Sequence, residues 1–325
     1  MTSRYRLLRS TFCRVSGSFR SIHNASVKVY NIRKSTKPCV LAFSLFTWLG
    51  FEKKLTAEDE LVHTIKHCIL FIQRNEYEKA EQLLHVALRQ AQQIRHELGI
   101  TYVYDVMANL ALQREELDKA KQLFIAVTQR IMADGAQEDD PRVIHLSVKL
   151  ARVSHLKKDY STAQLGYDWC IEKLNRLLET DPSDATQKLL AMAEDWYGRL
   201  FVDLNKCEEG LKLMKSSLNR MRLVPDMDKE EIVYQLNDIG TVCDSLGLSD
   251  DSITYFKEAI ELAKSAKIED VGTMYVNLGR AYINTQLLDA ARKSCGYAWK
   301  LGVMSKNQDV KQEAELCIKQ INNLV

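Results

Sequence analysis

Apolar residues recur at helical spacing along most of the chain, and residues 101–124 show this most clearly. They read TYVYDVMANLALQREELDKAKQLF, in which apolar positions three and four apart are separated by polar ones. Such spacing gathers the apolar side chains on one face of an α-helix, and the polar residues 113–116 interrupt it. The stretch therefore predicts two amphipathic helices joined by a tight turn.

The same pattern occurs six times along the chain. The six segments are residues 74–88, 114–127, 157–170, 204–218, 246–260 and 284–298. They align on a small anchor residue in the second helix: Ala80, Ala120, Ala163, Gly210, Ser252 and Ala291. Four positions later stand Leu84, Phe124, Tyr167, Met214, Phe256 and Cys295. Twelve positions before the anchor stand Cys68, Ala108, Ala151, Gly198, Gly240 and Gly279. Closely crossing helices need small residues at the crossing point, so each segment predicts a packed helix pair.

Three of the four prolines mark the boundaries between repeats. Pro141, Pro182 and Pro225 fall between the second and third, third and fourth, and fourth and fifth repeats, where a helix must stop. Residues 310–324 form a final amphipathic pattern, which predicts a helix capping the last repeat. The predicted fold is all-α: a solenoid of about six helix pairs with long helices over residues 57–325, ending in a C-terminal capping helix.

This pattern resembles the tetratricopeptide repeat family over roughly residues 58–305. LNDIGTVCDSLG (236–247) and YVNLGRAY (275–282) match the first-helix motif of that family well, whereas the fourth repeat matches it poorly. The anchors lie 40, 43, 47, 42 and 39 residues apart instead of the usual repeat of about 34. Either the helices or the loops between repeats must therefore be longer than in a standard member.

The resemblance implies a concave groove, lined by the first helices, that binds a peptide or a helix. Carried over position by position, the groove residues are Tyr102, Asp105, Asn109, Lys149, Arg152, Arg199, Tyr234, Asn237, Asn277 and Arg280. Asparagine amides can clamp an extended backbone, and arginine can hold a carboxylate with two hydrogen bonds. Only fragments of the family's chaperone-binding carboxylate clamp occur, so binding of chaperone C-termini is not expected.

The first fifty residues have a different composition. They carry six Arg and three Lys, and the first acidic residue is Glu52. Basic residues alternate with apolar ones, as in an amphipathic mitochondrial presequence. We therefore predict a disordered presequence over residues 1–37; the alternative is a basic tail that binds acidic surfaces.

An apolar segment follows, without charge between Lys37 and Glu52. As a helix, residues 38–51 would reach about 21 Å, short of the roughly 30 Å hydrocarbon core of a bilayer. An interfacial helix, a tilted span and a segment packed on the repeat body all remain open. We predict that residues 38–56 associate with the membrane.

Charge and cysteine content narrow the possible functions. Residues 51–325 carry 36 basic and 43 acidic side chains, and this mildly acidic body argues against nucleic-acid binding. The eight cysteines include no CxxC pair and are spread too evenly for a zinc site or a dense disulfide framework. We expect most of them to be small apolar residues in helix packing.

Motifs for catalysis are missing from the sequence. There is no GxGxxG, GxxxxGK[ST] or HExxH, so the sequence predicts no enzyme, cofactor, metal or small-molecule substrate. One alternative is a metal site at His63, His67 and Cys68, because the two histidines are four residues apart on one helix.

Three segments resemble, more specifically, a mitochondrial family of these repeat proteins. They are FSLFTWLGF (43–51), AEDELVHTIK (57–66) and TYVYDVMANLA (101–111), in this order after a basic leader. The resemblance implies a scaffold at the mitochondrial inner membrane. It also implies a role in assembly and upkeep of respiratory complex III, with clearance of fragments of its Rieske iron–sulfur subunit.

The alternative is a cytosolic adaptor of the kinesin-light-chain kind, whose repeats are also near 42 residues. Its coiled-coil heptads are missing from this sequence, and the basic leader would have no explanation.

Overall fold

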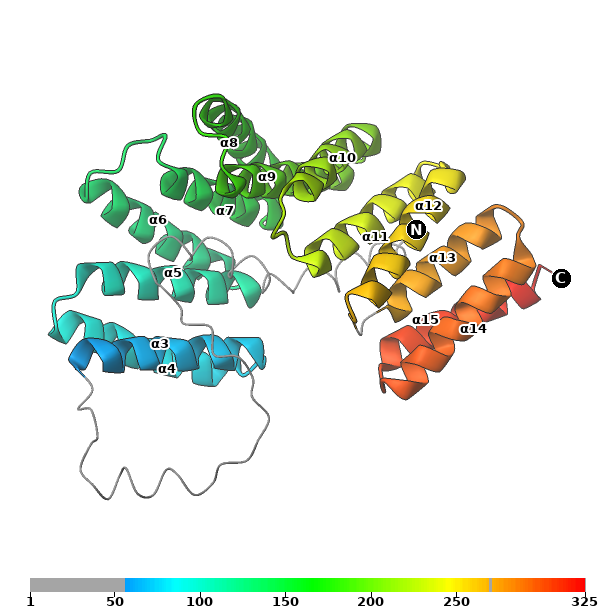
Figure 1. The fold of residues 1–325 in the computed structure, drawn as a ribbon, viewed down its shortest axis with the longest axis horizontal. Helices are drawn as coiled ribbons and strands as arrows, with labels where there is room; N and C mark the ends of the chain where they lie inside the picture. Colours follow the sequence, from blue (N-terminus) through cyan, green and yellow to red (C-terminus); the bar gives the residue numbers. More distant parts are fainter. Residues whose placement is uncertain (1–55, 269–270, 325) are drawn as a thin grey trace, which may run out of the picture. The chain divides into compact units, whose positions relative to one another are not determined.

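The computed structural model describes residues 56–268 and 271–324, and within these ranges it contains thirteen helices and no strand (Figure 1). Six consecutive helix pairs are followed by one final helix, which confirms the predicted all-α repeat. The chain divides into two compact units, and the division falls at Val153 and Ser154. We call the described part up to Val153 the N-terminal unit and the described part from Ser154 the C-terminal unit.

The helices up to α7 have 16 or 17 residues, and those from α8 onward have 13 to 21. The first five are α3 (Ala57–Gln73), α4 (Tyr77–Gln93), α5 (Glu97–Gln113), α6 (Leu117–Ala133) and α7 (Pro141–Leu156). The others are α8 (Tyr160–Thr180), α9 (Asp184–Asp203), α10 (Cys207–Leu223), α11 (Lys229–Ser245), α12 (Ser249–Ser265), α13 (Gly272–Asn284), α14 (Leu288–Met304) and α15 (Gln308–Asn322). The α7 helix contains the division between the units.

Both longer helices and a longer loop account for the wide repeat spacing. The α8 and α9 helices have 21 and 20 residues, and they lie between the two anchors that are furthest apart. A loop over residues 134–140 separates α6 from α7. Pro141 is the first residue of α7, while Pro182 and Pro225 lie in the loops before α9 and α11, as predicted.

The small anchor residues lie at the helix crossings. Five of them are fully buried at 0% exposure, and the sixth, Gly210, is also buried. A Cβ atom on Gly198 would lie 2.9 Å from the carbonyl oxygen of Gly210, so α9 and α10 meet backbone to backbone. A Cβ on Gly240 would lie 2.7 Å from the ring of Phe256. The fourth repeat, which matches the family motif poorly, thus has the same crossing as the others.

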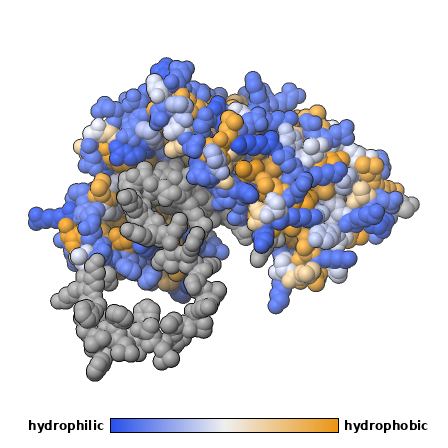
Figure 2. Space-filling model, in the orientation of Figure 1, coloured by the Kyte–Doolittle hydropathy of each residue, from blue (hydrophilic) through white to orange (hydrophobic). Residues whose placement is uncertain are grey.

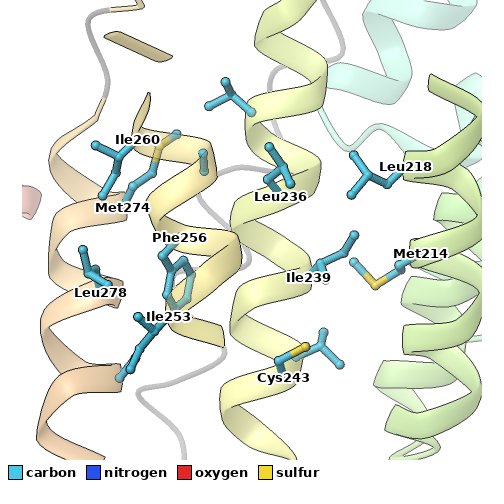
Figure 3. Close-up of a cluster of buried hydrophobic side chains, with 14 of the residues drawn as sticks. Met214, Leu218, Leu236, Ile239, Cys243, Ile253, Phe256, Ile260, Met274 and Leu278 are labelled. Atoms are coloured by element: carbon cyan, nitrogen blue, oxygen red, sulfur yellow. The ribbon is translucent and has the colours of Figure 1, made fainter. Parts of the chain in front are cut away.

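Between the crossings, the residue one turn after each anchor fills the core. In the C-terminal unit, a continuous cluster joins α10, α11, α12 and α13, and Figure 3 shows Met214, Ile239, Phe256 and Leu278 within it. The equivalent residues Leu84 and Phe124 are fully buried in the N-terminal unit.

The turn inside each pair repeats a single backbone geometry. One residue with positive φ stands five positions before each anchor: Asn75, Glu115, Lys158, Asn205, Gly247 and Gln286. The N–H of the next residue donates to a carbonyl five residues back, as from Glu116 to Ala111 at 2.9 Å. This hydrogen bond ends the first helix with a left-handed residue, a position that favours glycine.

The final helix caps the C-terminal unit as predicted. It buries Val310, Ala314, Cys317 and Ile321 against α13 and α14. Its opposite side exposes mainly polar residues: Gln312, Glu315, Leu316, Lys319 and Gln320. A polar outer face ends a stack of helix pairs that would otherwise leave an apolar surface exposed.

The cysteines agree only partly with the sequence interpretation. Cys68, Cys170 and Cys243 are buried free thiols in helix packing, as expected. Cys295 and Cys317 instead form a disulfide between α14 and α15, which we did not foresee. Sequence gives no pairing for cysteines spread in this way, because pairing depends on which helices meet.

The predictions for the N-terminal segment remain untested. The presequence (1–37) and the apolar segment (38–56) lie outside the described residues, apart from Thr56 at the start of α3. Within the described ranges, no helix is both long and apolar enough to cross a bilayer.

Candidate partner-binding face

The ten predicted groove residues lie on first helices of the pairs: α5, α7, α9, α11 and α13. We call the surface formed by these residues the first-helix face and describe it separately for each unit. In the N-terminal unit, α5 carries Tyr102, Asp105 and Asn109, and α7 carries Lys149 and Arg152.

The N-terminal part of this face is centred on Asp105. The amide nitrogen of Asn109 donates to the Asp105 carbonyl oxygen at 2.6 Å and to its carboxylate at 3.0 Å. The ammonium group of Lys149 lies 3.6 Å from the same carboxylate and 5.4 Å from the centre of the Phe124 ring. The structure therefore brings Asp105, Asn109 and Lys149 together.

Burial changes the ionisation of groups around Asp105. Burial lowers the pKa of Lys149, and the Asp105 carboxylate opposes that change. The pKa of Tyr102 is raised to about 12 by burial and by the negative charge of Asp105. Tyr102 thus presents a neutral hydroxyl at physiological pH.

One acceptor on the N-terminal part of the face lacks a donor. Asn109 is only 7% exposed, and its Oδ1 has no hydrogen-bond partner among the described residues. Its amide nitrogen is occupied by Asp105, so the amide keeps its carbonyl oxygen for another group. This oxygen is itself buried, and a buried acceptor without a donor is unfavourable.

In the C-terminal unit, Arg199 lies at the centre of a buried ion cluster. Its guanidinium lies 2.9 Å from Asp195 on α9 and 2.7 Å from Asp238 on α11. Burial acts to lower the pKa of Arg199, but the two carboxylates outweigh it and raise the pKa. Burial raises the pKa of Asp238, which Arg199 opposes. Arg199 thus ties two first helices together.

The remaining predicted residues also make contacts from helix to helix. Asn277 on α13 donates to Asn237 on α11 at 3.0 Å, and Arg280 lies 2.5 Å from Glu313 on α15. Tyr234 donates to Glu230 on its own helix at 2.9 Å. Of these contacts, the one between Asn277 and Asn237 joins successive first helices, and the one from Arg280 reaches the capping helix.

Two further helix-to-helix contacts were missed by sequence reasoning. His155 is buried and lies 2.9 Å from Asp203, and Asn284 donates to Asp244 at 2.7 Å. Three of these residues, His155, Asp203 and Asn284, follow a predicted groove position by one helical turn, whereas Asp244 lies two turns after Asn237. Extending the predicted positions by one turn on each first helix would therefore have found three of the four residues.

The alternative metal site is not supported by the described residues. His63 and His67 are exposed, whereas Cys68 is fully buried on the same helix. Burial raises the pKa of the Cys68 thiol to about 12, so the thiolate that binds a metal is disfavoured. Within the described ranges, no group of three or more His, Cys, Asp or Glu side chains could hold a metal ion.

Comparison with known proteins identifies the repeat and the relatives of this chain. Residues 236–265 match the tetratricopeptide repeat model. The mitochondrial tetratricopeptide repeat protein 19 homolog of Drosophila melanogaster is 38% identical over 283 residues, covering 86% of this chain and 77% of the relative. The mitochondrial tetratricopeptide repeat protein 19 of Homo sapiens is 28% identical over 279 residues, covering 81% of this chain and 73% of the relative.

Solved structures confirm the fold class. A signal-transduction ATPase with a tetratricopeptide repeat sensor, from Pyrococcus horikoshii, is similar with a TM-score of 0.60 and 15% identity. The match covers 84% of this chain and 38% of that one. A Podospora anserina kinesin light chain with nearly identical repeats gives a TM-score of 0.51 at 12% identity, covering 63% and 96% of the two chains. At these identities the likeness shows the repeat fold alone.

Proposed function

The chain belongs to the family of mitochondrial tetratricopeptide repeat protein 19, and from this we propose that it is a non-enzymatic protein-binding scaffold of the mitochondrial inner membrane. Its proposed role is assembly and maintenance of respiratory complex III. That role includes turnover of fragments of the Rieske iron–sulfur subunit. Two observations support this proposal: the sequence identity to these relatives over most of the chain, and the three segments that resemble the family.

The Asn109 acceptor supports a binding role for the first-helix face. Tyr102, Asp105 and Asn109 lie on successive turns of α5, so a bound segment would meet a hydroxyl, a carboxylate and an amide oxygen in line. Asn109 Oδ1 is buried and no described residue donates to it, so a backbone N–H of the partner could donate to it once neighbouring side chains move. This is recognition by hydrogen bonds along an extended or helical segment.

The surface of the C-terminal unit also favours protein contacts. Figure 2 shows hydrophobic patches among hydrophilic residues over the part that holds α11 to α15. Exposed apolar side chains on α14 and α15 include Trp299, Val303, Met304 and Leu316. Apolar residues within a polar surround are typical of protein interfaces.

The first test is native electrophoresis of gently solubilised mitochondria, probed for this protein and for complex III. Co-migration is the expected result. A wild-type chain that never co-migrates with complex III or its subcomplexes would contradict the complex III assignment, while the repeat fold would stand.

A matched pair of variants then tests the face. Asn109→Ala removes the unpartnered acceptor, whereas Asn322→Ala removes an exposed amide on α15 that only accepts from Arg292. We expect Asn109→Ala to weaken co-migration by roughly tenfold or less, as for one hydrogen bond, and Asn322→Ala to leave it unchanged. Thermal unfolding of both variants checks that the loss is not a folding defect. Equal co-migration of both variants would remove this face from the binding model.

The cytosolic kinesin-light-chain alternative has no specific observation in its favour. The structural likeness at 12% identity extends to the fold only, and the curated relatives are mitochondrial by name. Cell fractionation separates the two ideas, because an adaptor of that kind would remain in the cytosol.

A further inference from the structure

The disulfide between Cys295 and Cys317 joins the capping helix to the last helix pair. The two Cα atoms lie 6.1 Å apart, and 22 positions separate the residues in sequence. Cys295 is 0% exposed and Cys317 is 1% exposed, so the cystine lies inside the packing of α13, α14 and α15.

The cystine takes the place of a large side chain in the repeat. The other five pairs carry their core-filling residue at the position of Cys295: Leu84, Phe124, Tyr167, Met214 and Phe256. Gly279 on α13 provides the room, because a Cβ atom there would lie 2.2 Å from the Cys295 sulfur and 3.3 Å from the Cys317 sulfur. The last repeat is thus built around two sulfur atoms in place of an aromatic or long apolar group.

The other buried cysteines have a different chemical state. Cys68, Cys170 and Cys243 are buried free thiols. Burial raises the pKa of Cys68 and Cys170 to about 12 and that of Cys243 to about 11, which keeps these thiols protonated and unreactive. Among the described residues, Cys295 and Cys317 are the pair that the helices join as a disulfide, and Cys207 is a further free cysteine that is half-buried at the start of α10.

We propose that the C-terminal unit acquires this disulfide from a disulfide-carrying oxidoreductase in the intermembrane space, and that the solenoid therefore folds on that side of the inner membrane. One cysteine thiolate attacks the disulfide of the oxidoreductase, which gives a mixed disulfide and releases one oxidoreductase thiolate. The second cysteine of this chain then attacks the sulfur of the first cysteine in the mixed disulfide, which forms the cystine and releases the second oxidoreductase thiolate. The two thiols of this chain lose two electrons and two protons, and one disulfide of the oxidoreductase takes them up and becomes two thiols.

The burial of the cystine determines when the exchange takes place. Both sulfurs are inaccessible once α15 is docked, so the oxidoreductase must act before α15 docks or while it is released. After docking, an attacking thiolate reaches the cystine only if Val310, Ala314 and Ile321 leave the core as well. A disulfide protected in this way persists in an oxidising compartment, whereas a reducing matrix would keep newly made thiols reduced.

The assignment to the intermembrane space rests on the mitochondrial location in the proposed function. The disulfide itself can be tested without reference to complex III. Mitochondria that carry the full chain are treated with N-ethylmaleimide under denaturing conditions, then reduced and labelled with a polyethylene-glycol maleimide. We expect two added labels on the wild-type chain and on Cys243→Ala, and none on Cys295→Ala/Cys317→Ala. A wild-type chain without added label would overturn the proposal.

The membrane side is tested by adding protease to mitochondria whose outer membrane has been ruptured. We expect the C-terminal unit to be degraded while a matrix marker is protected. Protection equal to that of the marker would place the solenoid in the matrix and overturn the proposal, whatever the result with complex III.

The stability that the disulfide contributes can be measured independently on the purified protein. A reductant should lower the Tm of the wild-type chain by roughly 5–10 °C, because the closed loop no longer restricts the unfolded chain. Cys295→Ala/Cys317→Ala should show no response to the reductant, and Cys243→Ala should respond like the wild type. A wild-type Tm that ignores the reductant would contradict a structural cystine.

Discussion

The middle and the end of the C-terminal unit contain the same dipeptide at equivalent repeat positions, with different consequences. Gly198 and Arg199 lie on α9, and Gly279 and Arg280 lie on α13. In the middle, the glycine meets another backbone and the arginine is bound by two carboxylates. At the end, the glycine makes room for a cystine and the arginine pairs with one carboxylate on the cap. The neighbouring helices, and not the motif, determine what each residue does.

The arginines should show the largest difference. Arg199→Met leaves Asp195 and Asp238 as unpaired buried carboxylates, so we expect a loss of about 3–5 kcal/mol in the free energy of unfolding. Arg280→Met leaves Glu313, whose side chain is 27% exposed, and should cost about 1 kcal/mol or less. Urea unfolding of both variants measures the difference. Equal losses would mean that burial does not distinguish the two sites.

The next largest difference is expected between Gly198 and Gly279. In Gly198→Ala the added Cβ meets the Gly210 carbonyl, which cannot move without shifting α10, and we expect a loss of about 2–3 kcal/mol. In Gly279→Ala the added Cβ meets the Cys295 sulfur, which can rotate once the disulfide is reduced. Under reducing conditions, Gly279→Ala should therefore cost less than Gly198→Ala.

Two controls sharpen the glycine experiment. Gly296 on α14 has no atom within 4 Å of an added Cβ, so Gly296→Ala should stabilise the protein by about 0.5–1 kcal/mol through helix propensity. Combining Gly279→Ala with Cys295→Ala under reducing conditions should recover part of the loss. Strict additivity of the two changes would show that the glycine does not serve the sulfur.

The sequence predicted the helix pairs because their crossings depend on small residues at fixed repeat positions. It also placed polar residues on the first helices. It did not predict their partners, such as Asp238 for Arg199 or Glu313 for Arg280. Those contacts depend on how far successive first helices are shifted, and the repeat length varies from 39 to 47 residues. The pairing of Cys295 with Cys317 was missed because it depends on α15 packing against α14, which the spacing of the cysteines does not show.

The free energy of unfolding should depend on pH through Glu231, which lies at the start of α11 in the middle of the unit. Burial, with the nearby negative charge of Asp228, raises the pKa of Glu231 to about 7. The folded state therefore holds this proton more tightly than the unfolded chain, whose carboxyl has a pKa near 4.5. The stability contributed by this group thus falls as the pH rises from about 4.5 to about 7.

Glu231→Gln should remove that dependence and stabilise the protein above pH 7 by about 1–2 kcal/mol. Urea unfolding at pH 5.5 and 8 measures the effect. Glu179→Gln, which removes an exposed carboxylate on α8, is the control and should leave the pH profile close to that of the wild type. A wild-type profile in the Glu231 variant would contradict the raised pKa.

The smallest effect is expected in the turns that precede α10 and α14. Asn205 has φ 61° in the middle turn, and Gln286 has φ 61° in the end turn. Asparagine tolerates the left-handed region better than glutamine, because its short side chain can hydrogen-bond locally. Gln286→Gly should therefore stabilise the protein by about 0.5–1 kcal/mol, and Asn205→Gly by only a few tenths. Thermal unfolding of the two variants measures this, with Gly247→Ala as the reverse control, expected to destabilise. A larger gain at Asn205 would show that strain in the middle turn outweighs the residue preference.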